Sequence, residues 1–243
     1  MSLRAILFDL DNTLLENPID RFIPTYISAL GEHVAGHVDR ETFIAELLRA
    51  TEAMVADSDP QRTNKEVFDA VFFPAIGYQP EELTPLFEAF YAHRFSELRA
   101  ITCPKPVARP LIEWVFEQGF QIVIATNPLF PQGAVEERLA WAGVPVDDFD
   151  YDLVTTYEHM HAAKPNEAYY REIARRLGRR PAECLMVGDE WERDVAPALG
   201  VGMAAYWIAE PGQEFLSASS GLAGQGSLAD FYAWVQKIDE YDN

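Results

Sequence analysis

Two aspartates stand one residue apart directly after a short apolar run near the start of the chain. Ala5–Phe8 is apolar throughout, and Asp9 and Asp11 follow it in the stretch FDLDNTLL. Two anions about 4 Å apart repel by roughly 4 kcal/mol at an effective dielectric of about 20. A turn or helix cap is the ordinary explanation, because Asp, Asn and Thr all bond nearby backbone groups. A reactive pair of carboxylates is the alternative, and motifs elsewhere in the chain are needed to choose between the two.

Further polar side chains come after later apolar runs. Each has an ordinary explanation by itself, as a loop start, a solvated charge or a helix cap. The carboxyl ends of parallel strands share one edge of a sheet, and ligands bind outside that edge. The order and placement of these residues therefore predict a single site. They are Thr126, Asn127, Lys164, Gly188, Asp189 and Asp194.

The elements that must position these residues alternate between strands and helices. Apolar runs predict buried strands at 5–8, 121–125, 151–155, 183–187 and 203–207. Helical patterns separate them at 109–118, 134–142, 166–177 and in a segment that ends at Gly200. This alternation predicts an α/β fold with a Rossmann-like parallel sheet core. The stretch SASSGLAGQGS at 217–227 predicts a loop before a last helix at 228–238.

Residues 16–102 interrupt this alternation, because they contain no convincing strand. Apolar residues recur there at helical spacing, notably over 43–55 and 83–98, and the segments 24–34 and 65–73 are also helical in pattern. We therefore expect an inserted all-helical cap domain of about four helices. The predicted boundaries are 1–15 for the first part of the core domain, 16–102 for the cap, and 103–243 for the rest of the core.

Composition restricts the partners. The net charge is −20, from 39 acidic and 19 basic side chains, which disfavours nucleic acid and anionic membranes. No run of about 18 apolar residues predicts a membrane span, and the N-terminus does not resemble a signal peptide. Cys103 and Cys184 are expected to be buried free thiols of a cytoplasmic protein. We expect a monomer or a homodimer.

Taken together, these motifs resemble those of the haloacid dehalogenase-like superfamily, on its phosphatase side. The family pattern is Asp-x-Asp-x-Thr, then Thr or Ser after the second strand, then Lys, then Gly-Asp and a further acid. The resemblance covers the whole chain, and the position and size of the helical insert fit the phosphoglycolate phosphatase-like and β-phosphoglucomutase-like branch. The matching residues are Asp9, Asp11, Thr13, Thr126, Lys164, Gly188, Asp189 and Asp194.

The resemblance implies Mg²⁺-dependent hydrolysis of a small phosphate ester through an aspartyl-phosphate. Asp9 would be the nucleophile, and Asp11 would be the general acid and base. Asp9, the Asp11 backbone carbonyl and Asp189 would bind Mg²⁺, a hard cation that prefers oxygen ligands. Phosphate oxygens would be held by Thr126, Asn127 and Lys164. Supporting roles would fall to Thr13, Gly188 and Asp194, the last of which would orient Lys164 or metal-bound water.

Other functions on the same fold stay open. A 2-haloacid dehalogenase needs no metal, and Asp11 with the Gly188–Asp189 motif argues against it. A phosphomutase would differ in cap closure, and a non-enzymatic binding protein should have lost a motif, which this chain has not. Several features are left without a role: the HMH stretch at 159–161, Trp191, and the cap cations Arg21, Arg62, Lys65 and Arg94.

Overall fold

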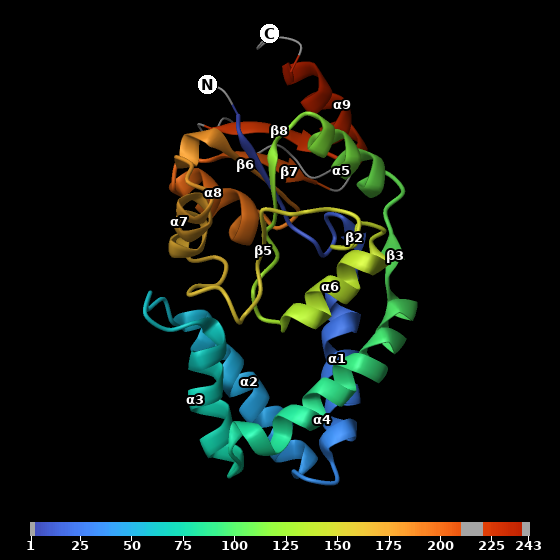
Figure 1. Cartoon of the computed structure of the whole chain (residues 1–243), viewed down its shortest axis with the longest axis vertical. Coiled ribbons are helices and arrows are strands. Elements are labelled where there is room, and N and C mark those ends of the chain that lie inside the picture. Colours follow the sequence, from blue (N-terminus) through green and yellow to red (C-terminus); the bar gives the residue numbers. More distant parts are fainter. Residues whose placement is uncertain (1–2, 210–220, 240–243) are drawn as a thin grey trace.

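The computed structural model describes residues 3–209 and 221–239, and its centre is a six-stranded sheet (Figure 1). Every neighbouring pair of strands in this sheet is parallel. This confirms the predicted α/β class with a Rossmann-like core. In spatial order the strands are β5 (Leu153–Val154), β4 (Gln121–Ile124), β1 (Ala5–Phe8), β6 (Cys184–Gly188), β7 (Ala204–Ile208) and β8 (Leu222–Gly226).

The central strand β1 is apolar at every position because helices cover both faces of the sheet. Ile6 and Phe8 pack in one cluster with α5 (Ala108–Glu117) and α9 (Leu228–Asp239). Ala5 and Leu7 pack in the other with α7 (Glu167–Arg176) and α8 (Ala196–Gly200). A strand buried on both faces reads as a continuous apolar run, which is the pattern seen here.

The insert consists mainly of helices. It contains α1 (Ile19–Val34), α2 (Arg40–Ala56), α3 (Asn64–Ile76) and α4 (Pro80–His93), followed by a 3₁₀ segment, Phe95–Ile101. A capping box between Thr63 and Glu66 begins α3, and Gly77 ends it with a positive φ of 78°. These helices lie beyond one edge of the sheet, on the side away from both termini (Figure 1).

The chain enters and leaves the insert through two paired links. β2 (Leu15–Glu16) and β3 (Cys103–Pro104) form a two-stranded antiparallel ribbon. Beside it, α6 (Gln132–Trp141) packs against the insert, where Trp141 stacks on Phe95 with ring centroids 5.4 Å apart. Both links and one core helix therefore meet the insert at the same place.

Some boundaries differ from those predicted from sequence. The loop predicted over 217–227 is wrong where it can be compared, because Leu222–Gly226 forms the edge strand β8. Glycine suits that strand: a Cβ on Gly224 would lie 2.7 Å from the Tyr206 ring. Residues 217–220 lie outside the described residues. The strand expected at 151–155 forms a ladder only over Leu153–Val154, and Pro181–Glu183 adds a short 3₁₀ turn.

Along the described ranges, none of the helices combines the length and the apolar character needed to cross a membrane.

Candidate active site

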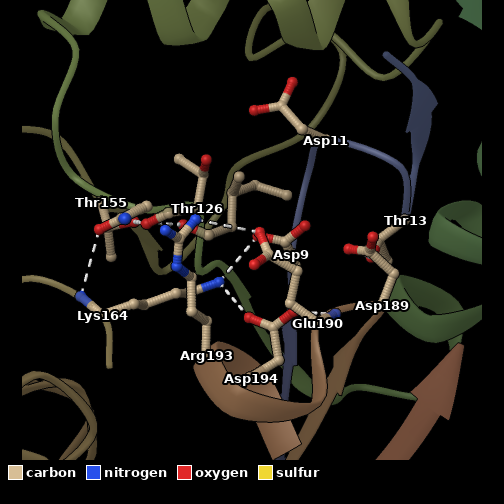
Figure 2. Close-up of polar contacts among 12 residues, drawn as sticks. Asp9, Asp11, Thr13, Thr126, Thr155, Lys164, Asp189, Glu190, Arg193 and Asp194 are labelled. Atoms are coloured by element: carbon tan, nitrogen blue, oxygen red, sulfur yellow. Dashed lines mark hydrogen bonds and ion pairs between the residues drawn. The ribbon is translucent and has the colours of Figure 1, made fainter. Parts of the chain in front are cut away.

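The site begins with a buried ammonium between two carboxylates at the carboxyl edge of the sheet (Figure 2). Lys164 Nζ lies 2.7 Å from Asp9 Oδ1 and 2.5 Å from Asp194 Oδ1. All three side chains are at least nine-tenths buried. Asp9 directly follows β1, whereas Lys164 follows β5 and Asp194 follows β6, so parallel strands bring together residues up to 185 positions apart (194 − 9).

Asp194 reaches this position through a tight backbone turn. After β6 the chain makes a π-helical turn at Trp191–Val195, in which the Asp194 amide donates to the Glu190 carbonyl at 2.7 Å. The Asp194 carboxylate folds back to accept a hydrogen bond from the Glu190 amide at 3.0 Å. Gly188 makes room for it, because a Cβ there would lie 2.3 Å from Asp194 Oδ2. The predicted glycine is thus a steric requirement of the turn.

Asp189 lies next to this trio. Thr13 Oγ1 donates to Asp189 Oδ1 at 3.5 Å, and the Trp207 indole nitrogen donates to the Asp189 carbonyl at 2.8 Å. Carboxylate oxygens of Asp9, Asp189 and Asp194 all lie within 4.8 Å of one another. Oxygen donors this close suit a hard divalent cation, so the residues present fit Mg²⁺.

The electrostatics show an excess of negative charge. Burial raises the pKa of Asp9 well above its usual range, with Lys164 opposing and the Asp194 and Asp189 charges adding to the rise. Burial, Asp194 and Glu190 raise the pKa of Asp189 to about 7. Burial lowers the pKa of Lys164, but Asp194 and Asp9 outweigh it and the value lies above the ordinary one. One ammonium therefore does not neutralise the carboxylates around it.

Thr126 and Asn127 form the neighbouring wall. The Asn127 side-chain oxygen accepts a hydrogen bond from the Lys164 amide at 3.2 Å, which joins the loops that follow β4 and β5. The Thr126 carbonyl accepts from the hydroxyls of Thr155 and Tyr169 at 2.7 and 2.9 Å. These bonds hold the backbone of Thr126 in place beside Asp9.

Asp11 is set apart from this cluster (Figure 2). Its carboxylate is hydrogen-bonded to Arg138 Nη1 and accepts from the Asn17 side chain at 2.9 Å. Arg138 is 1% exposed, donates to the Ala134 carbonyl, and lies 4.5 Å from the centre of the Phe130 ring. The two aspartates that are close in sequence therefore have different partners in this structure.

Sequence reasoning did not single out Arg138. A signal was present, because Arg138 lies on the buried face of α6 with Ala134, Val135 and Leu139. An arginine within an otherwise apolar helical stripe seldom lacks an anionic partner. Its partner Asp11 could not be read from that stripe, since it lies 127 residues away.

The HMH stretch at 159–161, Trp191 and the cap cations were given no role from the sequence, and they have ordinary structural surroundings. His161 Nδ1 lies 2.8 Å from Glu172 Oε1 on α7, and His159 is exposed. Trp191 packs against Trp207, with ring centroids 5.2 Å apart. Three of the four cap cations have acidic partners. Those pairs are Arg62–Asp57, Lys65–Asp69 and Arg94–Glu32.

Comparison with known proteins identifies the family of the chain. The family model described as a haloacid dehalogenase-like hydrolase matches residues 3–202. The chain therefore belongs to the haloacid dehalogenase-like hydrolase family, and it is an enzyme of the phosphatase type.

Its relatives are distant but match over most of their length. The chain is 29% identical to a ribulose-1,5-bisphosphate 5-phosphatase from Halopiger xanaduensis, over 86% of each protein. It is 26% identical to a glyceraldehyde 3-phosphate phosphatase from Methanopyrus kandleri, over 85% of this chain and 84% of that one. A 2-haloacid dehalogenase structure from Pseudomonas syringae has a TM-score of 0.63 at 21% identity, covering 97% of this chain and 99% of that one, which is a likeness of fold.

Proposed function

We propose that the enzyme hydrolyses a small phosphorylated metabolite through an aspartyl-phosphate on Asp9, with Mg²⁺ as cofactor. The observation that supports this most is the buried Asp9–Lys164–Asp194 arrangement with Asp189 beside it. Asp9, Asp189 and the Asp11 backbone carbonyl would hold the ion. When bound, Mg²⁺ would offset the charge of the phosphate and of the surrounding carboxylates.

The reaction divides into two displacements at phosphorus. An Asp9 carboxylate oxygen attacks phosphorus, the bond to the ester oxygen breaks, and the leaving alcohol takes a proton from Asp11. Water then attacks phosphorus, Asp11 accepts its proton, and the bond to Asp9 breaks to release inorganic phosphate. Lys164 and Thr126 hold phosphate oxygens, and Asp194 keeps Lys164 in place. For its role, the Asp11 carboxylate must turn from Arg138 towards the bridging oxygen.

The cap at 16–102 is proposed to close over this site during turnover. Lid closure excludes water from a reactive intermediate and completes the catalytic arrangement.

The alternatives on this fold make different products: a dehalogenase would release halide without metal, and a phosphomutase would return the phosphoryl group to a sugar phosphate. The location proposed for the enzyme is the cytoplasm, with a small phosphate ester as its partner.

The test separates the two aspartates by intact-protein mass. Each variant is mixed with an aryl phosphate and Mg²⁺ and is quenched rapidly in acid. Asp11→Asn keeps the nucleophile and an aryl leaving group needs little protonation, so we expect phosphoenzyme to accumulate. Loss of the general base should slow turnover by about 10² to 10⁴. Asp9→Asn should never gain the phosphoryl mass.

Metal removal completes the experiment. With the unmodified enzyme, a chelator should abolish phosphate release and added Mg²⁺ should restore it. Full activity in chelator, or halide release from 2-chloro acids alone, would overturn the proposed phosphatase chemistry. A phosphoryl group on Asp9→Asn but not on Asp11→Asn would reverse the two roles.

A further inference from the structure

A cavity of about 390 Å³ extends from the catalytic aspartates into the helical insert. One end is polar and is lined by Asp9, Lys164 and Arg138 among others. The other end lies among the insert helices, where the α2–α3 pair and the α1–α4 pair diverge towards the core (Figure 1). The volume falls in the usual range for pockets that enclose small molecules. A phosphate at Asp9 would therefore place its alcohol in the second end.

The wall of that second end carries no charge. In the described chain, every residue of 16–102 that lines the cavity is aliphatic, aromatic or threonine. The aromatic and aliphatic side chains come from all four helices. Examples are Ile23 and Ile27 on α1, Leu47 on α2, Phe68 and Phe72 on α3, and Phe87 on α4.

The few hydroxyls in this wall already have partners. Tyr26 and Tyr91 hydroxyls bond each other at 2.7 Å, and Thr51 Oγ1 donates to the Leu47 carbonyl at 2.8 Å. Several hydroxyls of a sugar phosphate would thus enter an environment with few free partners. Burying a polar group without a hydrogen bond is unfavourable, so the wall discriminates against polyhydroxylated alcohols.

A second observation concerns Leu48 on α2, which lines the cavity and has 46% of its surface exposed. Among the described residues, it is the large apolar side chain left exposed to solvent. A hydrocarbon in the cavity would give this side chain an apolar neighbour.

We propose that the substrate is the phosphate monoester of an apolar alcohol, alkyl, prenyl or aryl, whose hydrocarbon occupies the insert end of the cavity. This inference rests on the proposed phosphatase function and specifies the chemical class of the alcohol that leaves. The two relatives described above are named for polar sugar phosphates. Specificity here would come instead from removing apolar surface from water, which rises with each buried methylene.

The test is a matched series of esters. Phosphate release is measured with Mg²⁺ on methyl, propyl, butyl, hexyl and octyl phosphate, all below micelle-forming concentrations. We expect kcat/KM to rise by up to about fourfold per methylene until the cavity is full, and then to level off. Propyl phosphate should exceed glycerol 3-phosphate, which has the same carbon skeleton with two extra hydroxyls.

Two cap variants test the location. Leu47→Asn puts an amide into the wall and should reduce the octyl-to-methyl ratio of kcat/KM at least tenfold. Leu86→Asn is the control, because Leu86 is a half-buried leucine of α4 that does not line the cavity. It should leave the ratio unchanged. Ile27→Trp fills part of the cavity and should move the plateau to shorter chains.

The outcomes separate the two levels of the proposal. No dependence on chain length, with glycerol 3-phosphate faster than propyl phosphate, would overturn the apolar leaving group and leave the phosphatase function standing. No phosphate release from any ester, including an aryl phosphate, would overturn both. Equal effects of Leu47→Asn and Leu86→Asn on the ratio would show that the dependence arises outside this cavity.

Discussion

At the scale of single residues, the site depends on close packing as much as on charge. Lys164 is held by two carboxylates, and one of them reaches it only because residue 188 has no side chain. Asp11 meanwhile is held by Arg138 and Asn17. In the proposed mechanism Asp11 exchanges a proton, so turnover would require its contact with the buried Arg138 guanidinium to open.

Gly188→Ala tests the steric part of this arrangement. The new methyl group would lie 2.3–2.5 Å from atoms of the Asp194 side chain, which must move away from Lys164. We expect a loss of about 1–3 kcal/mol in the free energy of unfolding. Because a displacement near 1 Å can cost about 10²-fold in rate, kcat should fall by a similar factor.

Gly133→Ala is the matched control for that substitution. Gly133 lies in the first turn of α6, and nothing lies within 4 Å of a Cβ added there. Alanine is the better helix former, so stability should rise by at most about 1 kcal/mol, with unchanged kcat. Equal effects of the two substitutions, measured by urea unfolding and steady-state kinetics, would contradict the role given to Gly188.

At the scale of elements, α7 is joined to the loop before Lys164 by a buried carboxylate. Glu172 accepts hydrogen bonds from the His161 amide and ring and pairs with Arg176 at 2.7 Å. Burial raises the pKa of Glu172, but these bonds outweigh it and the pKa lies below its ordinary value. A depressed carboxyl pKa stabilises the fold above the unfolded-state pKa, and this contribution is lost as the pH falls through the folded-state pKa.

Glu172→Gln should therefore destabilise the protein in a pH-dependent way. At pH 7 we expect a loss of about 1.5–3 kcal/mol in the free energy of unfolding, the range for hydrogen bonds to a charged group. The difference in the free energy of unfolding between the variant and the unmodified protein should stay constant down to about pH 5.5 and become smaller below about pH 4.5. Urea unfolding across this range measures it. Glu113→Gln, in an exposed pair with Arg109, should cost less than 1 kcal/mol; a larger cost than for Glu172→Gln would contradict this account.

At the scale of the whole molecule, the two covalent links between the insert and the core lie side by side. The start of α3 makes a separate contact with the core, where the Asn64 amide donates to the Met160 carbonyl and the Lys65 amide to the Tyr157 carbonyl, at 2.7 and 2.8 Å. β2 and β3 pair side by side, so both chain crossings lie on a common ribbon. Pro104 stiffens the second link by fixing its φ. Two crossings at one place allow rotation of the insert about them without breaking its own packing. The cavity lies between the parts that such a rotation would bring together.

Distance measurements between paired spin labels test this closure. One label is placed at Ala45 on α2 and the other at Arg175 on α7, both exposed. Cys103, which was expected to be buried but is exposed on the short link strand β3, is replaced by Ser. Inorganic phosphate with Mg²⁺ should shorten the mean distance between them. A pair within the insert, at Ala45 and Ala92, should show no change. If neither distance responds, the insert does not act as a moving cap.

The sequence by itself determined the class of fold and which residues lie at the carboxyl edge of the sheet, where the site is. The period of apolar residues is a local property, so five of the six strands of the sheet and the helices of the insert could be placed within about five residues. Parallel topology then forces the carboxyl ends of the strands together. That is why Asp9, Lys164, Asp189 and Asp194 could be assigned to one site before any coordinate was known.

Only the tertiary structure decided where the side chains point and what they pack against. Asp11 and Arg138 are 127 residues apart, and no local pattern pairs them. The glycine-rich strand β8 forms because it adds to β7 and packs on Tyr206, a contact that overrides its weak local preference. The apolar cavity likewise arises from four helices that each read as ordinary amphipathic segments. Long-range packing selects among conformations that are equally compatible with the local sequence, and the cavity in the insert is a product of that packing.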